Sequence, residues 1–142
     1  IKPIGLAARD TLRLEMGFCL YGNDINDATS PLEAGLGWIT KFTKDFVDSE
    51  LFKSHKEQGT ARKLVGFELI DRGIPRHGNE VVDSHMNTIG VVTSGTQSPT
   101  LGKPIGMAYV PAAHSKPGSE ILVNIRGKAI RGIVVKMPFV QG

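Results

Sequence analysis

The chain has 142 residues, of which 40% are apolar and 22% charged, and its formal net charge at pH 7 is +3. This length fits a single domain that buries about two-thirds of the surface its unfolded chain would expose. The 17 Gly and 8 Pro indicate many turns in a folded protein. No stretch approaches the roughly 18 apolar residues that span a bilayer. We therefore expect a soluble protein with no membrane partner.

The modest positive charge does not indicate a nucleic-acid-binding protein. Lys and Arg residues are spread along the chain with acidic residues between them, and only 6% of the residues are aromatic. A nucleic-acid-binding protein usually concentrates its basic residues in a stripe with interleaved aromatic side chains. We expect no nucleic-acid partner, whereas small anions and an acidic protein partner fit the charge equally well.

The side chains that most often act as nucleophiles or metal ligands form no recognisable motif. Cys19 is the single cysteine, so it cannot form an internal disulfide, and we expect it to pack as a small apolar residue. The four histidines lack the close spacing of a zinc motif. We therefore expect no metal site.

The first predicted element is a short amphipathic helix from Leu6 to Met16, which contains no Gly or Pro. Its apolar stripe recurs at every fourth residue, at Ala8, Leu12 and Met16. Gly17 is placed to end the helix in the left-handed conformation. The turn-forming segment from Tyr21 to Asp24 follows it.

The charged residues of this helix have two open interpretations. In the first, Arg9, Asp10, Arg13 and Glu15 form a solvated face, on which Asp10 pairs with Arg13 for about 0.2 to 0.5 kcal/mol. In the second, an arginine offers its planar fork of donors to an anionic or amide-like ligand, next to the tyrosine of the following loop.

The segment after this loop begins like a helix, with Ser30 as the N-cap and Pro31 at the first helical position. Two glycines limit it to a turn or two, and the β-type residues from Trp38 to Phe42 follow. Trp38 is the only tryptophan. Two roles remain open for it: burial in the core, or a flat wall against an aromatic ligand.

A second amphipathic helix is predicted from about Ser49 to Glu57, with Asp45 or Asp48 as its cap and Gly59 at its end. The hydrophobic period then changes from helical to alternating. We therefore place a domain boundary here, between residues 1–59 and 60–142. We expect residues 60–142 to fold without the preceding part.

Short strands separated by Gly and Pro turns follow the boundary. They are predicted at Arg62 to Ile70, Glu80 to Val82, Thr88 to Thr93, Pro104 to Val110, Glu120 to Arg126 and Ala129 to Met137. Gly127 and Lys128 are expected to form a hairpin turn, and the polar residues from Ser94 to Gly102 a loop without a catalytic role. The fold class is α+β: two short helices followed by a small antiparallel β-barrel.

Five segments resemble the aminomethyltransferase family, the T-proteins of the glycine cleavage system. They are Gly5-Leu-Ala-Ala-Arg-Asp-Thr-Leu-Arg-Leu-Glu-Met-Gly17, Leu20-Tyr-Gly-Asn-Asp24, Pro31-Leu-Glu-Ala-Gly-Leu-Gly-Trp38, Val92-Thr-Ser-Gly-Thr-Gln-Ser-Pro-Thr-Leu-Gly102 and Ile105-Gly-Met-Ala-Tyr-Val110. The match runs through essentially the whole chain in the family's order. The resemblance places the chain in the C-terminal part of such an enzyme, so that residues 1–59 belong to the edge of its folate-binding core.

The resemblance implies an enzyme that transfers the one-carbon unit of a lipoyl-bound aminomethyl group to tetrahydrofolate and releases ammonia. The lipoyl carrier protein, the H-protein, is the implied partner and tetrahydrofolate the implied co-substrate. Arg9 matches a folate-contacting arginine of the family, Trp38 matches an aromatic residue near the folate cavity, and Tyr21 is a looser candidate. The family's catalytic aspartate lies upstream, so no catalytic residue is expected here and this chain alone should be inactive. The implied compartment is the cytoplasm in a bacterium or the mitochondrial matrix in a eukaryote.

Two alternatives remain open. Oxidases and dehydrogenases of dimethylglycine or sarcosine carry a similar C-terminal region behind a flavin domain. A folate-binding or protein-docking module without catalytic activity is the other possibility.

Overall fold

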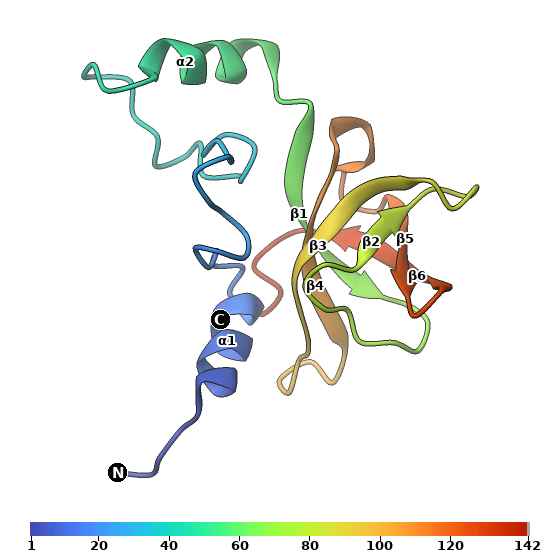
Figure 1. Ribbon diagram of the computed structural model, residues 1–142. Helices are drawn as coiled ribbons and strands as arrows, with labels where there is room; N and C mark the ends of the chain where they lie inside the picture. The colour runs from blue at the N-terminus through green and yellow to red at the C-terminus, as the bar shows by residue number, and fades with distance from the viewer. Residues whose placement is uncertain (142) are drawn as a thin grey trace.

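A computed structural model describes residues 1–141 and confirms the predicted fold class, two helices followed by an antiparallel barrel (Figure 1). The helices and strands are α1 (Leu6–Glu15), α2 (Ser49–Gln58), β1 (Arg62–Leu69), β2 (Glu80–Val82), β3 (Thr88–Gln97), β4 (Pro104–Pro111), β5 (Glu120–Ile125) and β6 (Lys128–Val135). A single 3₁₀ turn, Ala112–His114, follows β4. No helix among the described residues is long and apolar enough to cross a membrane.

The six strands close into a barrel in the order β1-β4-β3-β2-β5-β6, and every pairing is antiparallel. The interior is filled by alternate side chains of the strands, because successive residues of a strand point to opposite faces. The buried residues of this inner cluster are Val65, Phe67, Leu69, Val81, Val92, Ala108, Val110, Ile121, Val123 and Val134. Closure leaves the barrel without a free edge strand.

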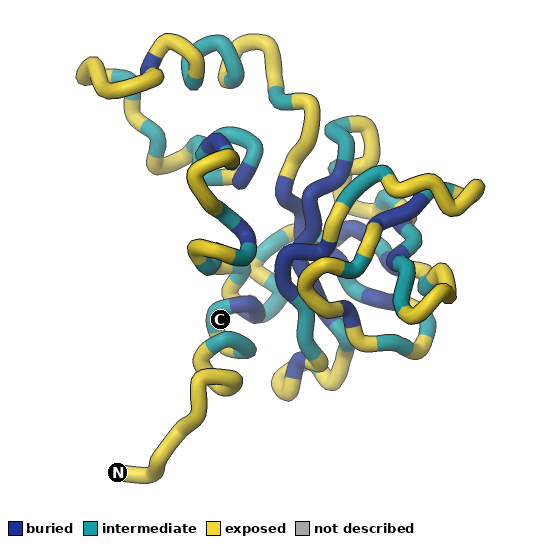
Figure 2. Tube along the Cα trace, viewed as in Figure 1, coloured by how far each residue is buried: buried dark blue, intermediate teal, exposed yellow. Residues whose placement is uncertain are grey.

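A second apolar cluster lies outside the barrel, on β1 and β4. It consists of Leu14, Leu64, Ile105, Met107 and Tyr109, with Cys19, Leu101, Met137 and Phe139 packed against it. The alternation of Ile105, Met107 and Tyr109 confirms the prediction for β4, but these side chains point outward. Ala108 and Val110 of the same strand fill the interior, so β4 carries apolar side chains on both faces. Figure 2 shows the strand buried along most of its length.

Two details of the predicted barrel were wrong. β3 continues to Gln97, because Ser94, Gly95 and Thr96 pair with β4, so the predicted Ser94 to Gly102 loop begins only at Ser98. The β5–β6 turn is formed by Arg126 and Gly127, not by Gly127 and Lys128, because Ile125 pairs with Lys128. Both turn residues have positive φ, as a two-residue hairpin loop with the right twist requires.

The end of α1 agrees with the prediction, but its buried face does not. Gly17 has φ 68°, and the amides of Gly17 and Phe18 bond to the carbonyls of Leu14 and Arg13, the pattern of a Schellman motif. The predicted stripe of Ala8, Leu12 and Met16 is exposed. The helix instead buries Leu14 and Glu15 against the barrel and the segment after β6, because Glu15 finds polar partners there.

The segment between the helices departs further from expectation. Ser30 and Glu33 form a reciprocal capping box, but only turns follow Pro31. No strand forms from Trp38 to Phe42, and Trp38 is 73% exposed, so the interpretation as a core residue was wrong. Asp48 occupies the N-cap position of α2 with φ 62° and makes no capping bond. Figure 1 shows α2 standing away from the barrel.

Glu15, the last residue of α1, forms hydrogen bonds to two other segments, residues 98–100 and residues 139–140. Its carboxylate accepts hydrogen bonds from Ser98 Oγ at 2.5 Å, Thr100 Oγ1 at 2.9 Å and the Thr100 amide at 3.2 Å. Its carbonyl accepts from the amides of Phe139 and Val140. Burial raises the pKa of Glu15, but the hydrogen bonds from Ser98 and Thr100 outweigh it and hold the pKa below its ordinary value.

The substitution Glu15→Gln should lower the free energy of unfolding at pH 7 by about 1 to 3 kcal/mol, because an amide cannot accept all three bonds. Since the folded pKa is depressed, the contribution of the carboxylate is present above the unfolded pKa near 4.5 and is lost as the pH falls through the folded value. Urea unfolding should therefore show a smaller difference in free energy of unfolding between the unaltered protein and the variant at pH 3 than at pH 7. The control is Glu50→Gln, at an exposed position. If the stability difference between the unaltered protein and Glu15→Gln did not depend on pH, the stabilising role of the Glu15 charge would be refuted.

We predict that residues 60–142 fold without residues 1–59, because the inner cluster lies entirely within the barrel strands. This shortened chain should be less stable than the whole chain, since Leu14 and Cys19 no longer cover the outer cluster. Residues 1–58 alone should be unfolded, since two short helices cannot offset about 1 to 2 kcal/mol of ordering entropy per residue. Amide NMR spectra test both pieces, and dispersed signals from residues 1–58 would contradict the boundary.

Candidate functional site

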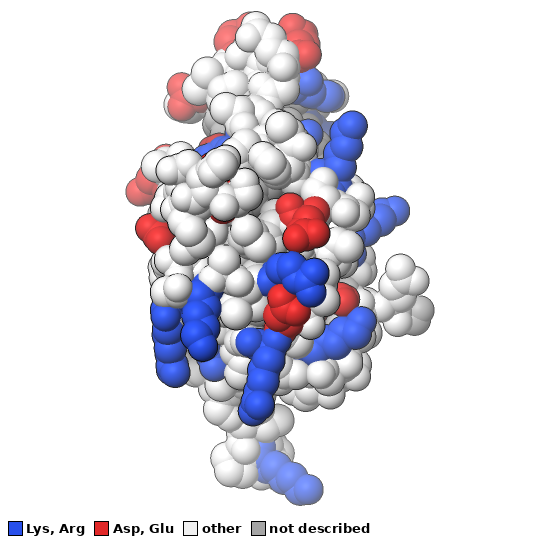
Figure 3. Space-filling model, turned by 90° about the vertical axis from the view of Figure 1, so that its right-hand side faces the viewer, with Lys and Arg blue, Asp and Glu red and all other residues white. Residues whose placement is uncertain are grey.

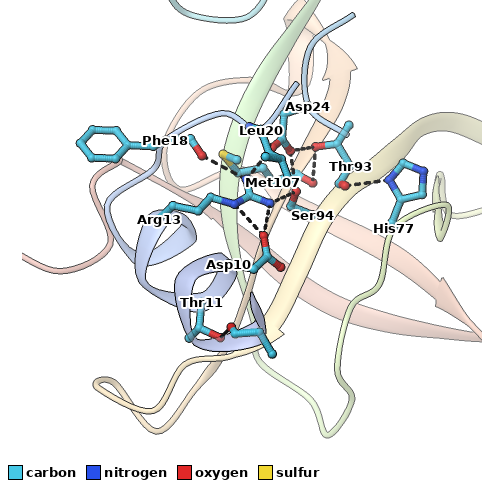
Figure 4. Close-up of polar contacts among 11 residues, drawn as sticks. Asp10, Thr11, Arg13, Phe18, Leu20, Asp24, His77, Thr93, Ser94 and Met107 are labelled. Atoms are coloured by element: carbon cyan, nitrogen blue, oxygen red, sulfur yellow. Dashed lines mark hydrogen bonds and ion pairs between the residues drawn. The ribbon is translucent and has the colours of Figure 1, made fainter. Parts of the chain in front are cut away.

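The loop that follows α1 is anchored by the buried side chain of Asp24 (Figure 4). Oδ1 accepts from the hydroxyls of Thr93 at 2.5 Å and Ser94 at 2.7 Å, both on β3. Oδ2 accepts from Arg13 Nη1 at 2.5 Å and from the Leu20 amide at 2.9 Å. Four donors thus satisfy a carboxylate that is removed from water, as a buried charge requires.

Arg13 supplies the positive charge that balances Asp24. Its Nε donates to Asp10 at 2.8 Å, which confirms the predicted pairing of Asp10 with Arg13. Its Nη1 also bonds to the Phe18 carbonyl, and its Nη2 donates to Ser94 Oγ at 2.8 Å. The solvated-face interpretation was therefore wrong for Arg13, whose side chain is only 9% exposed, and for the buried Glu15.

β3 can present both hydroxyls to Asp24 because it carries a bulge. Val92 pairs with Ala108 and Ser94 pairs with Met107, so Thr93 is the extra residue between them. A bulge bends its strand and lets two consecutive side chains approach one side. Tyr109 Oη completes the anchor by donating to the Asp24 carbonyl at 2.9 Å.

Two further groups near this anchor are held protonated. Burial, followed by the negative charge of Glu33, raises the pKa of Tyr109 to about 12. Burial and the charge of Asp24 raise the pKa of the Cys19 thiol. A thiol attacks as its thiolate, so Cys19 is a packing residue rather than a nucleophile, in agreement with its place in the outer cluster.

The anchor orders the elements that carry two of the three predicted folate contacts, α1 with Arg9 and the loop with Tyr21. Arg9 lies on the exposed side of α1, and among residues 1–141 its guanidinium makes no hydrogen bond or ion pair. Tyr21 follows Leu20 in the anchored loop and donates its hydroxyl to Asp27 at 2.5 Å. That hydrogen bond and the charge of Asp27 raise the pKa of Tyr21, so it stays a phenol at neutral pH.

Trp38 lines a hollow of about 550 Å³, which neither Arg9 nor Tyr21 lines. This hollow runs between the end of α1, the turn after Pro31 and the segment after β6. Its lining includes Phe18, Cys19, Ile25, Leu36, Trp38 and Met137. It is predominantly apolar, so it fits the flat aromatic part of a ligand better than a charged part. This hollow thus does not bring the three residues together.

Large apolar side chains are exposed mainly in the first part of the chain. Of the 16 in the described residues, 12 precede residue 52, and these include Leu12, Phe18, Tyr21 and Trp38. An exposed apolar surface of this extent usually marks a place where further protein or a ligand binds. No group of three or more His, Cys, Asp or Glu residues within 1–141 is arranged to hold a metal ion.

Sequence reasoning missed the part played by Arg13 and Asp24. The spacing of Asp10 and Arg13 pointed only to an exposed helix pair. The partners that make Arg13 a buried residue are 11 and 81 positions away in the chain, and no local pattern could have revealed them.

The substitution Asp24→Asn should lower the free energy of unfolding by about 3 to 5 kcal/mol, because it removes the buried counter-ion of the Arg13 guanidinium and leaves only the half-exposed Asp10. The matched control is Asp27→Asn on the exposed side of the same loop, which should change stability by no more than about 0.5 kcal/mol. Chemical denaturation measures both variants, and equal stabilities would rule out Asp24 as the anchor.

Comparison with known proteins agrees with this architecture. Residues 62–141 match the family described as the glycine cleavage T-protein C-terminal barrel domain, and residues 1–44 match the GCVT N-terminal domain. A crystal structure of the glycine cleavage system aminomethyltransferase T from Bartonella henselae superposes with a TM-score of 0.90 at 40% identity, over 96% of this chain and 39% of that one.

Two curated relatives share more of the sequence. An aminomethyltransferase of Bacteroides thetaiotaomicron is 62% identical over 141 residues, and one of Flavobacterium psychrophilum is 63% identical over 139 residues. Each alignment covers 98% of this chain and 39% of the relative, so the chain spans about two-fifths of their length. From the barrel match, these identities and the shared fold, the chain belongs to the glycine cleavage T-protein family.

Proposed function

We propose that this chain is the C-terminal portion of an aminomethyltransferase that uses tetrahydrofolate. The observation that carries the proposal is the identity of about 60% to proteins of that name across 98% of the chain. In the proposed reaction, the carbon–sulfur bond of a lipoyl-bound aminomethyl group breaks and a thiol remains on the lipoyl arm. The carbon bridges two nitrogens of the folate, and ammonia leaves.

The residues of this chain would serve to bind and orient the folate. Arg9 offers a planar fork of donors free of protein partners among the described residues, which suits a carboxylate or an amide-like ring edge. The Tyr21 phenol offers an exposed hydroxyl, and Trp38 offers a flat ring face. Such positioning accelerates a reaction between two bound groups.

Catalysis would need the part of the relatives that this chain does not span. We propose that the catalytic acid and the remaining walls of the folate site lie there. The exposed apolar surface before residue 52 supports this division, since it requires a cover. The proposed partner is the lipoyl carrier protein of the glycine cleavage system. By analogy with the bacterial relatives, the proposed compartment is the cytoplasm.

The relatives favour this function over the two alternatives. The matched proteins bear the name aminomethyltransferase, and none of those compared above is an oxidase or dehydrogenase of dimethylglycine or sarcosine. The proposed folate contacts Arg9, Tyr21 and Trp38 come from the resemblance to the family of the Gly5 to Gly17, Leu20 to Asp24 and Pro31 to Trp38 segments.

Arg9→Lys in the full-length enzyme tests the folate contact. Charge-assisted hydrogen bonds contribute about 1.5 to 3 kcal/mol, so losing the fork geometry should weaken folate binding roughly tenfold or more. Calorimetry gives the affinity. The stability of the variant should change by no more than about 0.5 kcal/mol, because Arg9 is exposed.

The matched control is Arg72→Lys, an exposed arginine after β1. Arg13 cannot serve as the control, because its removal would break the Asp24 anchor. Equal folate affinities for Arg9→Lys, Arg72→Lys and the unaltered enzyme would reject the role of Arg9. The 142-residue chain alone should give no methylene-folate above blank with loaded carrier protein, and turnover by it would refute the proposed location of the catalytic acid.

A further inference from the structure

A second hollow, of about 370 Å³, lies at the end of the barrel away from the residues proposed to bind folate. It separates the loop between β1 and β2 from the β5–β6 turn. Its lining residues are Gly73, Ile74, Arg76, Asn79, Ile125 and Arg126. Two of the six carry guanidinium groups and none carries an acid, so its chemistry is that of an anion site.

The loop and the turn are held close enough to share this hollow. A Cβ at Gly73 would lie 3.1 Å from Ile125 Cδ1, so the loop rests directly on β5. Asn79 Oδ1 accepts from the Arg76 amide at 2.8 Å and fixes the loop around Arg76. This bond uses the oxygen of the Asn79 side chain and leaves its NH₂ group as a further donor.

Arg126 occupies a backbone position that does not favour it. It is the first residue of the two-residue β5–β6 turn and has φ 55°. Turns of this kind strongly prefer Asn, Asp or Gly at that place, because other side chains strain the left-handed conformation. Neither packing nor the turn requires an exposed arginine here, so its presence points to a role for its charge.

The net charge of the chain is also distributed unevenly. Residues 60–142 contain ten Lys and Arg against five Asp and Glu, whereas residues 1–59 contain seven against nine. Among the described residues, three of the ten basic side chains form ion pairs: Arg62, Lys103 and Arg131. Arg76 and Arg126 are not among them. Figure 3 shows Lys and Arg side chains over the barrel on the side where Figure 1 places β5 and β6.

We propose that the hollow between Arg76 and Arg126 binds an oxyanion, the carboxylate or phosphate group of a ligand or partner. Two arginines that line one hollow can donate several hydrogen bonds to such a group, and the Asn79 NH₂ is a further donor in the same lining. Ile74 and Ile125 form the apolar part of the lining beside them. The site is independent of the proposed folate contacts.

NMR titration of the 142-residue chain tests this site with two probes, inorganic phosphate and triglutamate. The Nε–Hε signals of Arg76 and Arg126 should shift saturably with at least one of them, and the tighter probe identifies the source of the oxyanion. Arg126→Gly should weaken that binding at least about fivefold. This variant should fold well, because glycine adopts positive φ without strain.

Arg76→Gln is a second variant, which should weaken binding to a similar degree while keeping the main-chain bond to Asn79. The control is Lys63→Gln, an exposed cation on β1 that does not line the hollow and should leave binding unchanged. Shifts that do not saturate, or that persist equally in Arg126→Gly and Arg76→Gln, would overturn the proposal by showing only general charge screening.

Discussion

The buried ion pair between Asp24 and Arg13 is the interaction on which the arrangement of the first part of the chain depends. The Asp24 carboxylate is fully removed from water, and its four hydrogen bonds come from α1, its own loop and β3. A buried pair of this kind adds little net stability relative to an apolar replacement, because desolvation offsets the attraction. It does penalise every arrangement that leaves either charge unpaired, and it thereby fixes where α1 and the Tyr21 loop sit against the barrel.

The first part of the chain therefore also packs against the barrel and forms hydrogen bonds with it. β4 carries apolar side chains on both faces, and Leu14 of α1 belongs to the cluster on its outer face. Glu33 adds a second connection, since its carboxylate pairs with Arg62 and its carbonyl accepts from the Leu64 amide. The boundary near Gly59 is thus clear in the sequence pattern, but side-chain contacts and hydrogen bonds cross it in the folded chain. α2, by contrast, takes no part in either cluster.

The two ends of the molecule differ in chemistry. Residues 1–59 expose most of the large apolar side chains, whereas the barrel exposes basic side chains and few large apolar ones. The first surface is suited to burial against further protein and a ring-shaped ligand, and the second to contact with oxyanions in water.

The sequence alone determined the elements that depend on local chemistry. Gly17 and Gly59 ended the helices where predicted, the Ser30 and Glu33 spacing made its capping box, and alternation located five of the six strands to within two residues. Only the tertiary structure decided which face of each element is buried. Arg13, Glu15 and Asp24 look like surface residues until β3 and the 98–100 turn supply their hydrogen-bond partners. Those partners are 69 to 85 positions away along the chain, and burial of a charge depends on partners that only the folded chain brings together.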